Sequence, residues 1–223
     1  ISGKFINEGQ ISPDQASGTS GYIYNLFEST NTSTYDLNSG TALYIGMPGG
    51  GTLAGSVHVD AGAFISFSWA GTTELEATFT GSGQVNLGGS VSVSGNRVVS
   101  IGNPVSIGTK LGSGTIEVWG ALTGLGNLAE GTITIGGGAW GGGIAFVYGT
   151  LINYGSIWTG YGDWGGNGVL ANYGTFIYEL VGSYEDFYTS FYNRSGGLYK
   201  QVAGSLNFHG TFCNDGGIAI WGD

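Results

Sequence analysis

The chain has 223 residues and a formal net charge of −10, with only five Lys and Arg residues. Nucleic acids and anionic membrane surfaces are bound mainly through Lys and Arg, so this charge argues against both as partners. No apolar run reaches the roughly 18 residues of a membrane-spanning helix. Hydrophobic residues make up 41% of the chain despite its 47 glycines, which favours one large all-β domain with a substantial core. Because the sequence opens on Ile1 rather than Met, we expect a processed or excised segment.

The N-terminal half is predicted to consist of short strands separated by turns. Residues 12–26 have the Pro, Asp and Gly content of a loop. Alternating apolar and polar residues predict strands at 56–60, 63–69, 74–79 and 91–93. Turn glycines punctuate them at Gly55, Gly62, Gly71, Gly83 and Gly89. Three such strands would form a coil of about twenty residues, although a β-sandwich has similar strand spacing.

Residues 119–148 are the richest in glycine, with triplets at 136–138 and 141–143. Apolar strands bracket these triplets closely, including a predicted strand at 132–135. We therefore interpret the triplets as tight corners rather than as a flexible linker.

One motif recurs four times: Gly, any residue, Leu or Phe, a small or apolar residue, Asn, any residue, Gly, any residue and an apolar residue. The copies begin at Gly3, Gly149, Gly168 and Gly210, and a looser copy lies at 191–198. Successive motif asparagines in the C-terminal part are 19, 21 and 21 residues apart: Asn153, Asn172, Asn193 and Asn214. A period near twenty with strand-like content predicts a solenoid.

The motif places its asparagine on the inward face at a corner of the coil. Alternation puts the Leu or Phe and the Asn on the same face, and the following Gly permits a turn with positive φ. A buried amide is costly unless it is hydrogen-bonded. Stacked coils would let the amides bond to one another, as in cross-β structures. We therefore predict an asparagine ladder, and we expect Asn7 of the upstream motif to belong to it.

These observations predict a single domain over residues 1–223, a parallel β-helix (β-solenoid) with about twenty residues per coil. Residues 149–218 carry the clearest repeats. The segments 158–168 and 179–190 interrupt them and are aromatic or acidic, so we expect them to be loop insertions.

Catalytic and metal-binding patterns are weak. Asp60, Glu74 and Glu76 form the best carboxylate cluster for a polysaccharide hydrolase. Solvated carboxylates on the outer face of a strand give the same pattern, and no basic residue adjoins the cluster in the sequence. The soft ligands His58, His209 and Cys213 are too few for a zinc site. We expect no enzymatic activity, no cofactor and no metal.

Several side chains are candidates for contacts with partners. Cys213 takes an outward motif position, which suits a small apolar contact or an intermolecular disulfide. An aromatic row on one outer face would pack against a loop or another subunit, or would bind sugar rings: Tyr154, Trp158, Tyr161, Trp164 and Tyr173. Two N-x-S/T sequons make Asn31 and Asn193 candidate glycosylation sites, although chance also gives one or two in such a chain.

The Gly-x-Leu-x-Asn-x-Gly-Ser/Thr runs at 149–156 and 168–175 resemble those of secreted right-handed β-helices, such as autotransporter and haemagglutinin-type adhesin passengers. The composition also resembles the surface-layer and sheath proteins of archaea, including filamentous methanogens. The resemblance is firm over 149–218 and weak over 50–148. It implies an extracellular scaffold or adhesin without a cofactor.

We therefore expect an extracellular structural protein of the cell surface that polymerises with itself into a filament, sheath or surface layer. The last coil has no proline and a single carboxylate, Asp215, so its strand edge is open to pairing with the motif around Asn7 of another copy. One alternative is a carbohydrate-binding adhesin or phage-fibre module that uses Trp158 and Trp164. Another is a polysaccharide hydrolase that uses Glu74.

Overall fold

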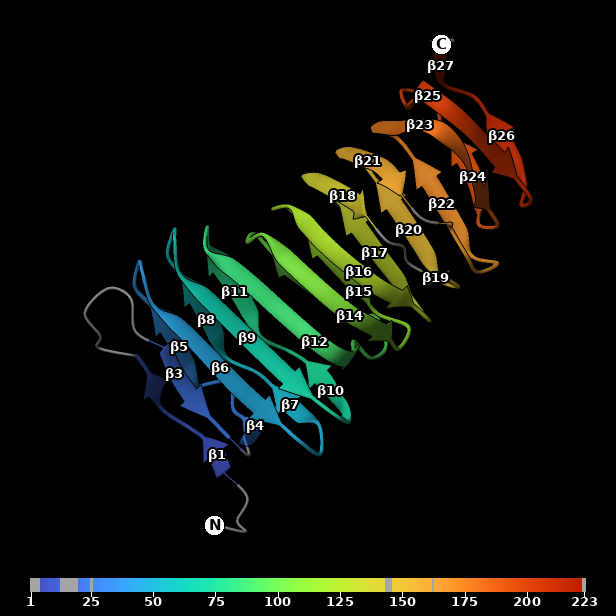
Figure 1. Ribbon diagram of the computed structural model, residues 1–223. Coiled ribbons are helices and arrows are strands. Elements are labelled where there is room, and N and C mark those ends of the chain that lie inside the picture. Colours follow the sequence, from blue (N-terminus) through green and yellow to red (C-terminus); the bar gives the residue numbers. More distant parts are fainter. Residues whose placement is uncertain (1–4, 13–19, 25, 143–145, 162, 222–223) are drawn as a thin grey trace.

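The computed structural model describes residues 5–12, 20–24, 26–142, 146–161 and 163–221. The chain winds as a solenoid whose coils stack in sequence order, from the N-terminal coil at one end to the C-terminal coil at the other (Figure 1). The strand pairs along it are parallel, as in β5 with β8 and β24 with β26. The described residues form no helix, and hence none that could cross a membrane. The predicted all-β parallel solenoid is confirmed.

Two sheets form the walls. Sheet B has 11 strands: β2 (Gln10–Ile11), β5 (Thr34–Leu37), β8 (Ser56–Val59), β11 (Thr78–Gly81), β13 (Val98–Ile101), β15 (Thr115–Val118), β17 (Thr132–Ile135), β20 (Thr150–Asn153), β22 (Val169–Asn172), β24 (Ser190–Asn193) and β26 (Phe212–Asn214).

Sheet A has 16 strands: β1 (Phe5–Asn7), β3 (Ser20–Ile23), β4 (Leu26–Ser29), β6 (Ala42–Met47), β7 (Gly51–Leu53), β9 (Phe64–Trp69), β10 (Thr72–Leu75), β12 (Gln84–Ser92), β14 (Val105–Leu111), β16 (Leu122–Leu128), β18 (Gly138–Gly142), β19 (Phe146–Val147), β21 (Ser156–Tyr161), β23 (Thr175–Phe187), β25 (Leu198–Phe208) and β27 (Gly217–Ile220).

Each coil has three faces, because sheet A covers two of them. The first half of β12 pairs with β9 and its second half pairs with β10, so one bent strand spans both faces. We call the face of β3, β6, β9 and β27 face A1, and the face of β1, β4, β7 and β10 face A2. Sheet B forms the third face. Short turns join sheet B to both A faces, whereas in the last coils A1 and A2 are two halves of one strand.

The coils differ in length. Thr34 pairs with Ser56, a step of 22 residues, whereas Thr115 pairs with Thr132, a step of 17. Near the C-terminus Phe191 pairs with Phe212, a step of 21 residues. The predicted period of about twenty residues per coil therefore holds as an average, and the coils in the middle of the solenoid are shorter.

The core consists of inward side chains stacked in columns, one residue per coil. On sheet B, one column changes character along its length: Ile11, Tyr35, Val57, Phe79, Ile101, Val118, Ile135, Asn153, Asn172, Asn193 and Asn214. The middle coils are filled by Val, Ile and Leu. Toward the C-terminus, aromatic rings replace these residues, and Phe176, Phe187 and Phe191 contact one another edge to face.

Three predicted segments differ from the structure. The expected loop 179–190 lies mostly in β23, which continues to Phe187, because Glu185, Asp186 and Phe187 pair with the next coil. The expected loop 158–168 begins within β21, and Trp164 forms a bridge with Phe187. The predicted strand 74–79 is instead two strands, since β10 and β11 meet at a corner at Glu76 and Ala77. Aromatic and acidic residues thus lie in the walls as well as in turns.

The buried tyrosines of the C-terminal core predict a loss of stability at alkaline pH. Tyr199 is 3% exposed, and burial together with the nearby Tyr178 raises its pKa above the ordinary value of 10.0. The folded chain therefore keeps this proton above pH 10, where the unfolded chain loses it, so the stability present below pH 10 is lost as the pH rises. Above pH 10, the free energy of unfolding should therefore fall less steeply with pH in Tyr199→Phe than in the wild type, by about 1.4 kcal/mol per pH unit. Urea denaturation over this range measures it, and equal slopes would contradict the assignment.

Candidate functional site

The four C-terminal motif asparagines form a continuous chain of amide hydrogen bonds. Asn153 Nδ2 donates to Asn172 Oδ1 at 2.7 Å, and Asn172 Nδ2 donates to Asn193 Oδ1 at 2.7 Å. Asn193 Nδ2 donates in turn to Asn214 Oδ1 at 2.6 Å. The first three residues are fully buried. The asparagine ladder expected from the repeat spacing is therefore present over these four coils.

The ladder has a direction, because the amide nitrogens of Asn153, Asn172 and Asn193 all donate to the following coil. The same nitrogens also donate to backbone carbonyls of that coil, as Asn153 does to Thr175 at 3.1 Å and Asn193 to Gly217 at 2.9 Å. At the N-terminal end, Asn153 pairs in register with Ile135, and its Oδ1 has no partner. At the C-terminal end, Asn214 is exposed, and its Nδ2 donates only to Gly216 of its own turn at 3.1 Å.

Asn7 is not a member of this ladder, which corrects the expectation from the sequence. It ends β1 on face A2 and pairs in register with Ser29, whereas the ladder residues end strands of sheet B. Its Oδ1 accepts a hydrogen bond from the Gly9 amide at 3.1 Å, and its Nδ2 is buried without a partner. The same local motif therefore occurs at two different corners of the coil, which the motif alone does not distinguish.

In the three regular C-terminal copies, the motif glycines serve close packing rather than positive φ. None of Gly155, Gly174 and Gly216 is among the positive-φ glycines. A Cβ on Gly155 would overlap the carbonyl oxygen of Gly137 one coil below, and a Cβ on Gly174 would overlap that of Gly155. Glycine is needed here because successive corners stack backbone on backbone.

Removing one inner rung should cost more than removing the last one. Asn172→Ala leaves the amide of Asn153 and the carbonyl oxygen of Asn193 without their side-chain partners in a buried site, and we expect a loss of about 2–4 kcal/mol. Asn214→Ala removes an exposed amide that accepts from Asn193 and donates to Gly216, while Asn193 keeps its bond to the Gly217 carbonyl, and we expect a loss of about 1 kcal/mol or less. Chemical denaturation of both variants measures the difference. Equal losses would show that the amides do not act as a buried chain.

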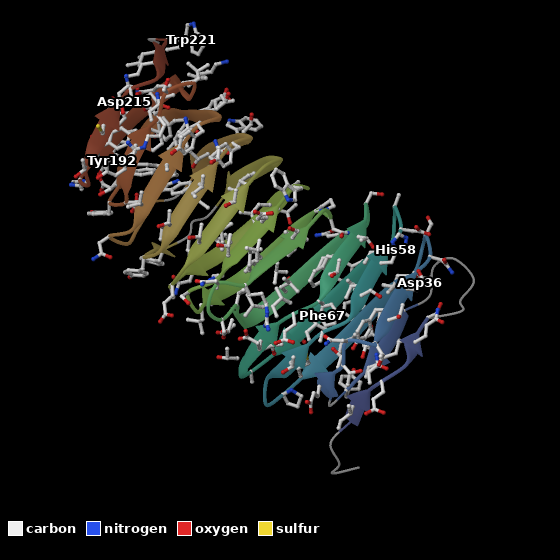
Figure 2. All side chains as sticks on the ribbon, turned by 180° about the vertical axis from the view of Figure 1, so that it is seen from behind. Asp36, His58, Phe67, Tyr192, Asp215 and Trp221 are labelled. Atoms are coloured by element: carbon white, nitrogen blue, oxygen red, sulfur yellow. The ribbon has the colours of Figure 1, made fainter. Side chains whose placement is uncertain are left out.

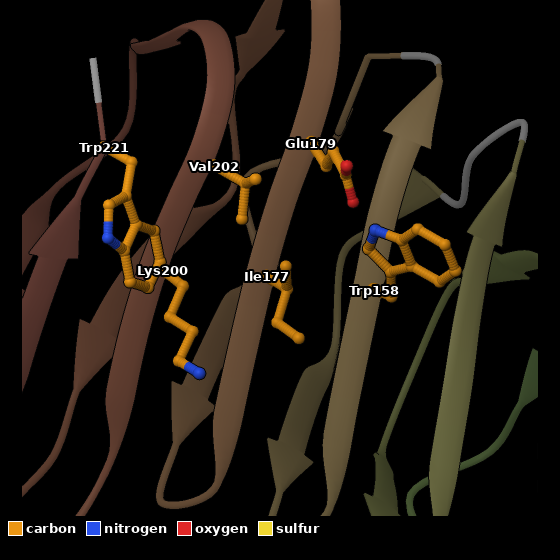
Figure 3. A pocket seen from close by; sticks show the side chains of 6 residues that line it. All are labelled: Trp158, Ile177, Glu179, Lys200, Val202 and Trp221. Atoms are coloured by element: carbon orange, nitrogen blue, oxygen red, sulfur yellow. The ribbon is translucent and has the colours of Figure 1, made fainter. Parts of the chain in front are cut away.

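A shallow groove lies on the outer side of face A1 near the C-terminus (Figure 3). Its volume is about 520 Å³, and its lining consists of Trp158, Ile177, Glu179, Lys200, Val202 and Trp221. Trp158, Ile177 and Lys200 are neighbours on successive strands. Lys200 Nζ lies 5.8 Å from the centre of the Trp221 ring. Trp158 and Trp221, which are 41% and 52% exposed, lie toward opposite ends of the groove.

The predicted aromatic row is only partly present. Tyr154 and Tyr173 are exposed and stack at 5.1 Å between ring centres. Trp164 is 4% exposed, stacks on Phe187 and donates its indole N–H to Thr159 Oγ1 at 3.3 Å, so the expectation of a surface role for it is wrong. The side chain of Tyr161 lies outside the described part of the chain. The sequence reveals neither Trp221 nor Lys200 as neighbours of Trp158, because they are separated by whole coils.

Cys213 and the two sequons have different surroundings. Cys213 is free and exposed, and it pairs in register with Tyr192 on the outer side of sheet B. Asn193 is fully buried in the ladder, so the folded solenoid leaves no room for a glycan on its amide nitrogen. Asn31 is exposed in the turn between β4 and β5 and stays a candidate.

The carboxylate cluster is held by an arginine. Arg97 Nη1 lies 2.6 Å from Glu76 Oε1 and 3.3 Å from Glu74 Oε1, because the turn after β12 brings it one coil above them. No basic residue lies near these carboxylates in the sequence, but Arg97 lies beside two of them in the structure, so the expectation was wrong. Asp60 instead pairs with His58 at 3.2 Å. The described residues contain no group of three His, Cys, Asp or Glu side chains placed to hold a metal.

Lys110 is a buried cation that sequence reasoning missed. It is fully buried, and its Nζ donates to the carbonyl oxygens of Gly112, Gly114 at 2.7 Å and Glu130 at 3.2 Å. Burial lowers the pKa of Lys110 to about 8, while Glu130 acts in the opposite direction. Its three donors hold a corner between two coils together, which is a structural role. In the structure Lys110 takes an inward position, because it pairs with the apolar residues Val91 and Leu128 on the neighbouring strands. In the sequence, only the alternation of inward and outward positions around Lys110 points to this burial.

The last described coil exposes side chains that belong to inward columns. Ile218 continues the column of Phe176 and Tyr199 yet is 45% exposed, and Ile220 continues that of Tyr178 and is 63% exposed. Phe212, above Phe191, is 38% exposed. Among the described strands, β26 and β27 end the two sheets, so each has one unpaired edge (Figure 1). Tyr192, Asp215 and Trp221 mark this end from behind (Figure 2).

Comparisons with protein-family models, with curated proteins and with solved structures find no match to this chain.

Proposed function

We propose that this chain is an extracellular structural protein whose copies assemble end to end into a polymer at the cell surface. The observation that carries the proposal is the end of the solenoid at β26 and β27. Unpaired strand edges template the addition of further strands, and exposed inward side chains favour burial. Both features coincide on one surface, and a second copy of the chain supplies parallel strands to cover them.

The charge and the side walls support the same proposal. The net charge of −10 keeps copies apart when they approach side by side, because like charges repel over the length of the wall. Contact between the ends places few charges together, since the last coil from 207 to 221 carries Asp215 as its single carboxylate. Addition of copies along the solenoid axis is therefore favoured over side-by-side association. The location outside the cell is supported by the resemblance of the motif to secreted β-helices.

Assembly should respond to charge at the exposed end and not at the side. We expect wild-type protein to form rods that lengthen with concentration, as seen by negative-stain microscopy and light scattering. Ile220→Lys places an ammonium group in the exposed column at the end, and it should abolish the rods while leaving the fold unchanged by circular dichroism. Val98→Lys is the matched control, because Val98 is 53% exposed on the outer side of sheet B. A monodisperse monomer at high concentration would overturn the proposal.

A second candidate function is carbohydrate binding in the groove of Trp158 and Trp221. Indole rings pack against the apolar faces of sugar rings, and Lys200 and Glu179 would supply a donor and an acceptor for hydroxyl groups. The observation that favours it is the placement of both indoles and both charged groups along one groove (Figure 3). In this candidate site Trp221 takes the place of Trp164, which the sequence had suggested as the second glycan-binding residue.

The glycan proposal predicts binding that depends on both indoles. On a glycan array, wild-type signals should fall at least tenfold for Trp158→Ala and for Trp221→Ala, since each removes a large apolar contact. Trp119→Ala is the matched control, because Trp119 is 55% exposed and does not line the groove. Binding that persists in both groove variants would contradict this candidate.

A further inference from the structure

The two ends of the solenoid fit together in one register. This inference rests on the proposed end-to-end assembly. We propose that the first coil of one copy continues the last coil of another so that each strand joins the face to which it belongs: β1 joins face A2, β2 joins sheet B and β3 joins face A1. We call this arrangement the face-matched register. The asparagine ladder then stops at Asn214 instead of passing to Asn7 of the next copy.

The exposed edges of the last coil carry the argument. The second half of β25 pairs on one side with β23, through Ser205 to Phe208, and belongs to face A2. β26 follows on sheet B, and β27 follows on face A1, where it covers only residues 198–201 of β25. The next strands of a continuing solenoid would lie on A2, B and A1 in turn. β1, β2 and β3 occupy these faces in this order.

The columns then specify which residues meet. On the outer side of sheet B, one column runs from Gln10 through Thr34 and Ser56 and ends at Tyr192 and Cys213. In the face-matched register, Gln10 of the next copy therefore lies beside Cys213. Ile11 covers Asn214, and the preceding Gly9 lies above Phe212.

The two surfaces are complementary in size at these positions. Gly9 has no atom within 4 Å of the place where its Cβ would be, which leaves room above the ring of Phe212. On face A1, the column that ends at Tyr199 and Ile218 begins at Gly21. A second glycine of the first coil thus lies over a second large exposed side chain of the last coil, and the exposed apolar groups become buried.

The competing register places the motif of residues 3–11 on the motif of residues 210–218, with Asn7 over Asn214. It would extend the ladder, but it requires the next copy to rotate by one face. The three corners are not equivalent, because A1 and A2 of the last coil are halves of β25 whereas turns join both to sheet B. In the rotated register β1 would lie on sheet B and β2 on face A1, so the strands of the two copies would no longer meet the faces to which they belong. An apolar neighbour for a terminal rung already exists within the chain, where Ile135 lies against Asn153.

Disulfide trapping distinguishes the two registers, with the native Cys213 as the reporter. Neighbouring parallel strands are about 4.8 Å apart, a separation that a disulfide can bridge. Gln10→Cys tests the face-matched register, and Ile6→Cys tests the motif-matched one, because Ile6 would then lie beside Cys213. Tyr192→Cys is the positive control, since Tyr192 is the in-register neighbour of Cys213 within one chain. Each protein is oxidised at assembling concentration and is run on a non-reducing gel.

The face-matched register predicts a ladder of covalent multimers for Gln10→Cys, intramolecular bonds only for Tyr192→Cys and monomers for Ile6→Cys. Multimers of Ile6→Cys without multimers of Gln10→Cys would overturn the register and leave end-to-end assembly standing. Wild-type dimers joined through two Cys213 residues, without longer multimers in any variant, would overturn it in favour of tail-to-tail contact. Monomers by light scattering in every sample would overturn both the register and the proposed function.

Discussion

Parallel stacking of like side chains, one coil above the next, is the constraint on which this structure depends. Because strands such as β20, β22 and β24 pair in register with their counterparts in the next coil, an inward residue meets the same few neighbours above and below. An aliphatic column therefore stays dry, and an amide column satisfies itself. The column that passes from Ile135 to Asn153 shows both solutions on one face. A single coil cannot pair the backbone groups at its strand edges or cover its apolar core. The neighbouring coils supply both.

This dependence on neighbours gives the last described coil its central place in the proposed assembly. Phe212, Ile218 and Ile220 have the inward orientation of core residues but the exposure of surface residues. The same coil carries the exposed rung Asn214 and the exposed thiol of Cys213. Its chemistry suits a further layer of parallel strands better than it suits water. The groove of Trp158 and Trp221 lies on the outer wall of face A1, and Trp221, which directly follows β27, belongs both to the groove and to the end of the solenoid.

The sequence predicted the fold through one signal, the recurrence of Asn153, Asn172, Asn193 and Asn214 at nearly constant spacing. Local pattern could not say which corner a motif occupies, and for this reason Asn7 was misassigned. It also could not separate a loop from a wall when both contain aromatics, as in 179–187, where pairing with the next coil decides. Contacts across whole coils escaped it altogether: Arg97 with Glu74 and Glu76, Lys110 with the carbonyl of Glu130, and the approach of Lys200 to Trp221.

Hydrogen exchange of the asparagine side-chain amides, followed by NMR, tests the central idea most directly. Buried amides that donate to the next coil exchange only when coils separate. The Nδ2 protons of Asn153, Asn172 and Asn193 should therefore be protected as strongly as the core backbone, and those of Asn214 should exchange rapidly. Rapid exchange of all four side-chain amides, beside a protected backbone, would contradict the stacked-coil account.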